Sequence, residues 1–223
     1  MAHILDNPAW NALNTGNAAL AQGSERAKCF PADVAFFVGI PDGSAQSFDA
    51  LYNVVPFEVA GFQTVHETAI PAPWRVMRAV KVSQFVYEGS DVEQNEMGVV
   101  PLSEKDVPQM LSLTKLTDPG PFLNRTIDLG HYFGIFDGDK LVAMAGQRMN
   151  PIPYAEISAV CTHPDYLGRG YASMLLKFQI RRIMAVGQIP FLHVLATNER
   201  AIKIYERLGF VLRKETTLYI IGK

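Results

Sequence analysis

The sequence has no long apolar run and no excess of charge of one sign. It holds 20 Lys and Arg against 22 Asp and Glu, a net charge of -2, and this excludes the strongly basic surface that binds nucleic acid or an anionic membrane without sequence preference. No apolar stretch approaches the ~18 residues that cross a bilayer, and the N-terminal segment lacks the basic and apolar parts of a signal peptide. We therefore expect a cytoplasmic protein that binds neither nucleic acid nor membrane.

Cysteine is scarce as well. Cys29 and Cys161 are far apart and have none of the short spacings that zinc ligands show. Two isolated thiols argue against a disulfide framework and suit a reducing compartment. The histidines at positions 66, 131 and 193 show no metal-ligand spacing either, so we predict that the protein requires no metal.

A polar, acidic stretch over residues 88–97 separates two apolar segments and favours a domain boundary. We place an N-terminal α/β domain of unknown role at residues 1–95. Within it, apolar runs predict strands at Val34–Ile40 and Val76–Tyr87, and Asn7–Gln22 is expected to contain a short helix.

A faint repeat links the two halves. The segment Phe36–Gly43 is similar to Tyr132–Gly138, because both are apolar strands that end in Asp-Gly. Such strands also arise by chance. Two interpretations stay open: the N-terminal half is a degenerate copy of the other half, or it is unrelated.

The second domain, residues 97–223, has clearer signals. Ser103 with Asp106 resembles a capping box that opens a helix, Asp137-Gly138 predicts a hairpin turn, and Gly209 is expected to end the last helix. The predicted order is strand, helix, three strands, helix, strand, helix and two strands. The strands are expected at 99–102, 132–136, 141–148, 154–162, 191–196, 210–212 and 218–221.

The segment Leu167-Gly168-Arg169-Gly170-Tyr171-Ala172 lies between a predicted strand and an amphipathic helix. In such a turn, backbone N–H groups converge at a helix N-terminus, where the helix dipole favours an anion. Glycines allow a phosphate to approach closely, so the turn indicates a pyrophosphate site. A dinucleotide-binding fold is disfavoured, because it needs a third glycine and a turn that follows the first strand of a βαβ unit.

Two blocks make this indication specific. Ala155–Ala172 and Asn198–Phe210 resemble the GNAT acetyltransferase superfamily, in particular its FR47-like branch, over about Met97–Lys223. The resemblance implies an α/β GNAT fold, with a mixed, mostly antiparallel sheet that is flanked by helices and splayed to admit the pantetheine arm of acetyl-CoA. It also implies that acetyl-CoA is the co-substrate, and it leaves open that the N-terminal half is a degenerate GNAT-like unit.

The superfamily's pyrophosphate pattern is Gln or Arg, two variable residues, Gly, one variable residue, and Gly or Ala. Gly170 and Ala172 match it, whereas Leu167 stands where Gln or Arg is expected. Since the cradle is mostly backbone and Arg169 offers a nearby cation, we predict weakened rather than abolished coenzyme binding. The residues that the resemblance implies for co-substrate binding are Val160, Cys161, Thr162, Leu167, Gly168, Arg169, Gly170, Tyr171, Ala172, Asn198, Ala201 and Tyr205.

Alternation along strand 154–162 predicts one candidate cleft face, made of Glu156, Ser158, Val160 and Thr162. The resemblance implies that the Val160 N–H polarises the thioester carbonyl and that Glu156 is the general base. A base is needed because an amine with a pKa near ~10 arrives protonated. Two other roles for Glu156 stay open, pairing with a neighbouring arginine and anchoring of the substrate.

Tyr205 matches the tyrosine that protonates the departing CoA thiolate in many superfamily members. Its alternative role is packing, since Ile202, Tyr205 and Leu208 share helical spacing. Asn198 is implied to contact the pantetheine arm, and it is also a candidate helix cap.

Other candidates are weaker. Cys161 next to His163 suggests a thiol nucleophile, but two residues on one strand face do not guarantee the geometry. The cations Lys177, Arg181 and Arg182 are predicted to form a solvated helix face, with contact to the CoA 3'-phosphate as the alternative.

We therefore predict an N-acetyltransferase that moves an acetyl group from acetyl-CoA directly to a primary amine in a ternary complex. The acceptor is a small molecule or a peptide, open among amino acids, polyamines, drugs and protein lysines, and a homodimer is compatible with the sequence. Two alternatives remain: a non-catalytic CoA-binding regulatory module, which Leu167 favours, and transfer of a longer acyl group.

Overall fold

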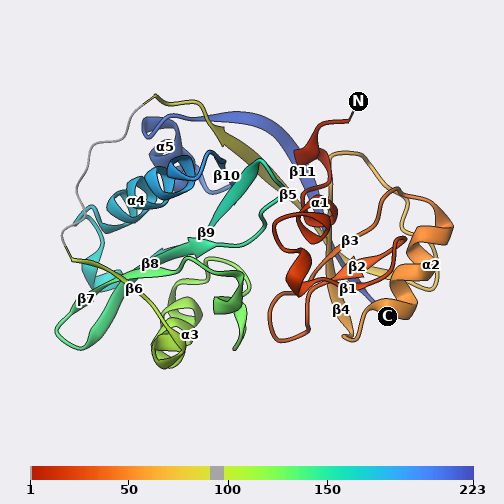
Figure 1. Cartoon of the computed structure of the whole chain (residues 1–223), viewed down its shortest axis with the longest axis horizontal. Helices are drawn as coiled ribbons and strands as arrows, with labels where there is room; N and C mark the ends of the chain where they lie inside the picture. Colours follow the sequence, from red (N-terminus) through yellow and green to blue (C-terminus); the bar gives the residue numbers. More distant parts are fainter. Residues whose placement is uncertain (1, 91–97) are drawn as a thin grey trace.

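The computed structural model describes residues 2–90 and 98–223, where eleven strands form a single sheet with the order β1-β2-β3-β4-β11-β5-β10-β9-β8-β7-β6 (Figure 1). Only β3 with β4 and β9 with β10 are parallel neighbours, so the sheet is mixed and mostly antiparallel, as predicted. The strands are β1 Gln22–Gly23, β2 Lys28–Cys29, β3 Phe37–Gly39, β4 Val59–Thr64, β5 Arg75–Tyr87, β6 Val99–Pro101, β7 Phe133–Asp137, β8 Lys140–Gln147, β9 Tyr154–Thr162, β10 Ile189–Leu195 and β11 Phe210–Gly222.

Helices cover the sheet at both of its ends. In the C-terminal half, apolar side chains of α4 pack with β9 and β10, while those of α3 pack with β8. These helices lie on opposite sides of the sheet in Figure 1. The helices are α1 Pro8–Asn14, α2 Ala45–Val54, α3 Val107–Thr117, α4 Tyr171–Ala185 and α5 Glu199–Arg207, and short 3₁₀ turns occur at Ile4–Asp6, Ala18–Leu20, Glu104–Asp106, Thr126–Leu129 and Pro164–Tyr166.

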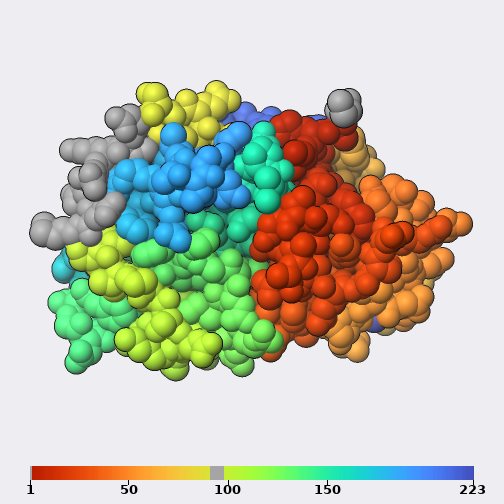
Figure 2. Space-filling view, viewed as in Figure 1, coloured from red at the N-terminus to blue at the C-terminus, as the bar shows by residue number. Residues whose placement is uncertain are grey.

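Strands cross between the two halves of the sequence. β11 lies between β4 and β5, and β5 lies between β11 and β10. One apolar cluster also joins the halves, because Leu13 and Phe37 pack with Met149 and Phe191. Figure 2 shows the N-terminal half, in red and orange, packed directly along the other half. The boundary proposed at 88–97 lies largely outside the described residues, and the two-domain division stays a prediction.

The strand order repeats on either side of the β5–β11 pair. β2 is antiparallel to β3, which is parallel to β4 across α2, and β4 is antiparallel to β11. Likewise β8 is antiparallel to β9, which is parallel to β10 across α4, and β10 is antiparallel to β5. This repeat supports a degenerate copy, but it makes β3 equivalent to β9, whereas the sequence echo had paired β3 with β7.

Several predicted elements change. The two apolar runs at 210–212 and 218–221 form one strand, β11, whose pairing with β5 shifts between Leu212 and Lys214. The polar residues between these runs stay in the strand because Lys214 to Thr217 pair with β5, and from Thr217 onward β11 pairs with β4 as well. The helix expected within Asn7–Gln22 is α1 with a short 3₁₀ turn, and α2 and β4 were not predicted.

Candidate active site

A cleft of about 360 Å³ opens where β9 and β10 part. These strands pair only from Tyr154 with Ile189 to Glu156 with Phe191, although both continue beyond that point. The cleft lies between the two halves of the chain. Its lining is Phe36, Phe37, Gln63, Arg78, Val80, Val82, Asp118, Pro119, Gly120, Pro121, Arg148, Ile157, Ser158, Ala159, Val160, His193, Val194, Leu195, Asn198, Ala201, Tyr205, Leu218 and Ile220.

Sequence reasoning predicted part of this cleft. Of the proposed site residues, Val160, Asn198, Ala201 and Tyr205 line it. Glu156 is fully buried beside the cleft and is not among the lining residues. The walls from β3, β4, β5 and β11 carried no signal in the sequence, since nothing local indicates that these strands lie next to β10.

A bulge in β9 decides which side chains face which way. Ala159 has φ +53°, and the pairing of β8 with β9 shifts between Met144 and Gly146. Ile157 and Val160 therefore pack in the same cluster under α4, while Ala159 and Cys161 pack against α3. The predicted single face of Glu156, Ser158, Val160 and Thr162 is wrong, because the bulge breaks the strict alternation of the strand.

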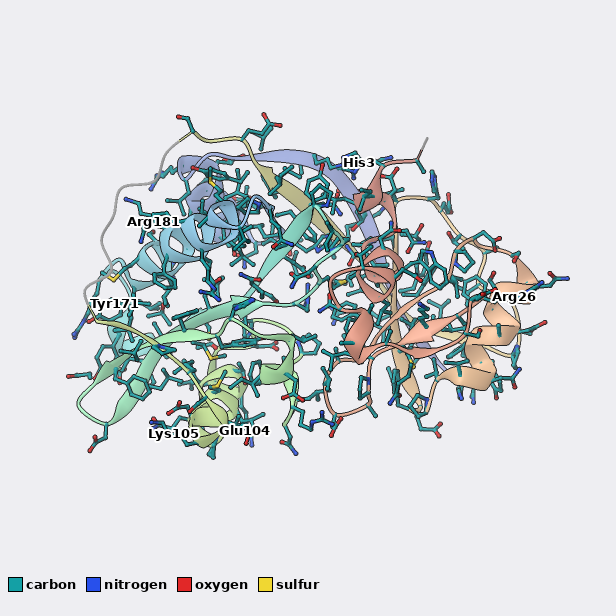
Figure 3. All side chains as sticks on the ribbon, in the orientation of Figure 1. His3, Arg26, Glu104, Lys105, Tyr171 and Arg181 are labelled. Atoms are coloured by element: carbon teal, nitrogen blue, oxygen red, sulfur yellow. The ribbon has the colours of Figure 1, made fainter. Side chains whose placement is uncertain are left out.

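The glycine turn opens α4 as predicted. Gly168 and Gly170 have φ of +81° and +80°, and nothing lies within 4 Å of where a Cβ would be. Gly170 is the N-cap and no side chain caps the helix. The first N–H groups of this 15-residue helix thus have no side-chain cap, and the space beside both glycines is open. Such a terminus fits an anion. In Figure 3, Tyr171 marks this start of α4 and Arg181 lies farther along the same helix.

Side chains around the turn are held by the neighbouring hairpin. The Arg169 guanidinium stacks on the Tyr166 ring at 4.5 Å, and the Tyr166 hydroxyl donates to Asp137 Oδ2 at 2.7 Å. Leu167, at the position of the superfamily's Gln or Arg, is 48% exposed. The turn therefore offers backbone donors and one stacked cation.

Glu156 is the most strongly engaged carboxylate of the site. It accepts from Arg148 Nε at 3.0 Å and Nη2 at 2.5 Å, from the Met149 N–H at 3.2 Å, and it lies 2.7 Å from His193 Nδ1. Burial alone would raise its pKa, but Arg148 and His193 outweigh burial and lower the pKa to about 2. The arginine pairing left open by the sequence is thus present, and it keeps Glu156 ionised.

A hydrogen-bonded chain continues from His193 to the N-terminal half. Gln84 Nε2 lies 3.0 Å from His193 Nε2 and also donates to the Leu5 carbonyl. Gln84 Oε1 accepts from Arg213, which in turn donates to Asp6. Since both ends of the Gln84 amide are fixed, His193 Nε2 must accept and Nδ1 must donate to Glu156. Sequence reasoning missed this chain because its members lie up to 207 residues apart.

Tyr205 and Asn198 meet the cleft from α5. Burial raises the pKa of Tyr205 to about 12, so its phenol stays protonated at neutral pH, and its ring packs 6.1 Å from that of Phe210. Asn198 Oδ1 accepts from the Ala201 N–H at 3.2 Å and caps α5. The packing and capping roles are therefore present, and the contacts with a coenzyme stay predictions.

The alternative nucleophile finds no support. Burial raises the pKa of Cys161 to about 11, which disfavours its thiolate, and His163 Nδ1 accepts from the Asp165 N–H instead. Across residues 2–90 and 98–223, no cluster of His, Cys, Asp and Glu has the makings of a metal site. In the same two segments, no helix is long and apolar enough to span a bilayer.

Comparison with known proteins shows the family to which this chain belongs. Residues 132–220 match the family model described as FR47-like protein. A crystal structure assigned as an acetyltransferase of the GNAT family, from Novosphingobium aromaticivorans, is 33% identical, with alignment over 100% of this chain and 99% of that one and a TM-score of 0.92. The chain belongs to the GNAT family. The resemblance predicted from the sequence is thereby confirmed.

More distant GNAT structures share the fold alone. A GCN5-related N-acetyltransferase from Kribbella flavida is 16% identical, with coverage of 95% and 93% and a TM-score of 0.59. A GNAT acetyltransferase from Colwellia psychrerythraea is 14% identical, with coverage of 84% and 78% and a TM-score of 0.54. No curated protein matches this GNAT chain.

Proposed function

We propose that this protein transfers an acetyl group from acetyl-CoA directly to a primary amine in a ternary complex. Membership of the GNAT family supports acyl transfer. The observation that carries the proposal is the combination of a glycine turn open at the start of α4 with a cleft formed where β9 and β10 part.

The residues present fit such a co-substrate. The N–H groups of the turn 167–172 would hold the pyrophosphate, because they are the free donors of a helix start. Arg169 adds a cation on the Tyr166 ring. The unpaired edge of β9 beyond Glu156 would hold the pantetheine amides through the backbone of Val160, Cys161 and Thr162. Asn198 and Ala201 form the opposite wall.

The chemistry requires loss of a proton from the amine, attack of its nitrogen on the acyl carbon, and cleavage of the carbon–sulfur bond. The Val160 N–H would stabilise the oxyanion. A water in the cleft would take the amine proton and pass it to solvent, because Glu156 does not line the cleft and its contacts with Arg148 and His193 hold its pKa at about 2, which leaves it a weak base. Tyr205 would protonate the thiolate and recover its proton from solvent.

Thiol release from acetyl-CoA, measured with a panel of amines, tests the activity, and Tyr205→Phe tests the acid. General acid catalysis contributes about 100-fold or more, so we expect Tyr205→Phe to lower kcat about 100-fold with little change in coenzyme Kd. Tyr154→Phe is the matched control, since Tyr154 is on β9 but does not line the cleft. Coenzyme binding without amine-dependent thiol release would instead favour a non-catalytic module, and an acyl-CoA series would reveal a longer acyl group.

A further inference from the structure

Two arginines line the cleft. Arg78 on β5 lines the cleft with an exposed side chain, and within the described segments it has no ion pair or hydrogen bond. Arg148 also lines the cleft, but its Nε and Nη2 are bound to Glu156. Among the described residues, no carboxylate therefore forms an ion pair with Arg78.

The wall around Arg78 is apolar. Residues 78, 80 and 82 of β5 all line the cleft, because alternate residues of a strand share a face. Arg78 is paired with Ile220, and Val80 with Leu218, both on β11. Phe37 also lines the cleft, with the Arg148 guanidinium 4.5 Å from its ring. A guanidinium beside an aliphatic and aromatic surface suits a ligand with an anionic end and an apolar body.

Carboxylates are scarce among the residues that line the cleft. Asp118, on the loop after α3, is the single carboxylate among the described residues that line the cleft. A dicationic acceptor such as a polyamine would place its second ammonium in the same cleft as the Arg78 guanidinium, and this placement is unfavourable. A carboxylate meets in Arg78 a planar donor pair of matching geometry.

We infer that the acceptor is an amine that also carries a carboxylate and an apolar side chain, an apolar amino acid, with its carboxylate on Arg78. This inference rests on the proposed function and names its acceptor class. Arg78 acts here in specificity and takes no part in the chemical step.

The test compares L-phenylalanine with L-phenylalaninamide and phenethylamine as acceptors, using acetyl-CoA and thiol release. We expect kcat/KM for phenylalanine to exceed that for the amide about tenfold, the effect of one charge-assisted contact. Arg78→Met should remove this preference and leave the amide rate unchanged. Arg78→Glu should reverse the preference. Arg75→Met is the matched control, since Arg75 is an exposed arginine of the same strand that does not line the cleft.

The outcomes separate the two proposals. If all three amines release thiol but phenylalanine is not preferred, the inference fails and the proposed function stands. The same holds if Arg78→Met lowers kcat/KM equally for phenylalanine and its amide. The same reactions are repeated with malonyl-CoA, whose acyl group carries a carboxylate. If Arg78→Met lowers the rate only with malonyl-CoA, Arg78 binds the acyl group and not the acceptor, and the inference is overturned. No thiol release with any amine defeats the proposed function itself. Thermal melting of both Arg78 variants checks that they remain folded.

Discussion

Glu156 combines complete burial with a full negative charge. Such a group is stable only when its hydrogen-bonding capacity is met, and Arg148, His193 and the Met149 N–H meet it here. Removal of any one partner leaves part of the carboxylate's hydrogen-bonding capacity unmet. The same contacts that hold the carboxylate in place also keep it from being protonated as the pH falls.

This burial predicts a defined acid sensitivity. The Glu156 pKa is about 2 in the folded state against an ordinary value of 4.5, so the unfolded chain binds its proton first as the pH falls. The stabilisation is present in full above pH 4.5 and is lost as the pH falls toward 2, by an amount on the order of 3 kcal/mol. Urea unfolding between about pH 5 and 3 should show this loss.

Glu156→Gln separates this effect from that of other carboxylates. The variant should be less stable at neutral pH and should show a shallower fall of unfolding free energy with acid. Asp165→Asn, at an exposed position, should keep the slope of the unaltered protein. If Glu156→Gln keeps that slope as well, the carboxylate is not held ionised by its neighbours.

At the scale of elements, the starts of α2 and α4 differ although their strand surroundings repeat. The Asp42 carboxylate accepts from the Ser44 N–H at 3.0 Å, the Ser44 hydroxyl at 2.6 Å and the Ser47 hydroxyl at 2.7 Å. The hydrogen bonds from Ser44 and Ser47 lower the pKa of Asp42. In the N-terminal half, the Asp42 carboxylate thus supplies an anion at the start of α2, whereas no side chain caps the start of α4.

Two glycines that flank α4 allow a test of the open turn. Gly170 and Gly187 lie at opposite ends of the helix with φ of +80° and +73° and free space around each Cβ position. Alanine at either position should cost about 1–2 kcal/mol of stability through backbone strain. Only Gly170→Ala should also weaken coenzyme binding, about tenfold or more, because it distorts the N–H cradle. Calorimetric titration with CoA measures both variants, and an equal affinity would place the anion elsewhere.

Local signals account for the elements that the sequence predicted. The Asp-Gly turn of β7–β8 and the apolar face of α4 each depend on residues close together in the chain. The bulge at Ala159 gave no signal, since alanine is not a residue that favours positive φ. The continuity of β11 through the polar residues after Arg213 is set by its pairing with β5, and only tertiary structure reveals it.

The residues of the candidate site likewise fall into those that the sequence predicted and those that it did not. Val160, Asn198 and Tyr205 were identified because they belong to sequence blocks of the family, and they do line the cleft. Arg78 and His193 were not assigned a role in the site. Their position there depends on the pairing of β5 with β10 and β11, which joins residues more than a hundred apart in sequence.

At the scale of the whole molecule, β11 from the C-terminal half lies between β4 and β5 from the N-terminal half. This arrangement predicts that the two halves stay together when the chain is cut between them. A protease site introduced between Ser90 and Gly98 should yield two fragments that stay together on gel filtration, since β5 and β11 pair from Tyr87 with Phe210 to Arg75 with Gly222. Residues 98–223 expressed alone should be unfolded or aggregated, because β10 and β11 lose a shared neighbour. Two separately folded fragments would support the simple division near residue 96.

The place of β11 along the chain also bears on biosynthesis. β4 and β5 are made long before it, yet both remain open edges until residues 210–222 emerge from the ribosome. Leu218 and Ile220, which complete the wall beside Arg78, arrive at the same moment. A nascent chain therefore has neither a closed sheet nor an acceptor pocket, and a stalled one would expose strand edges that invite aggregation.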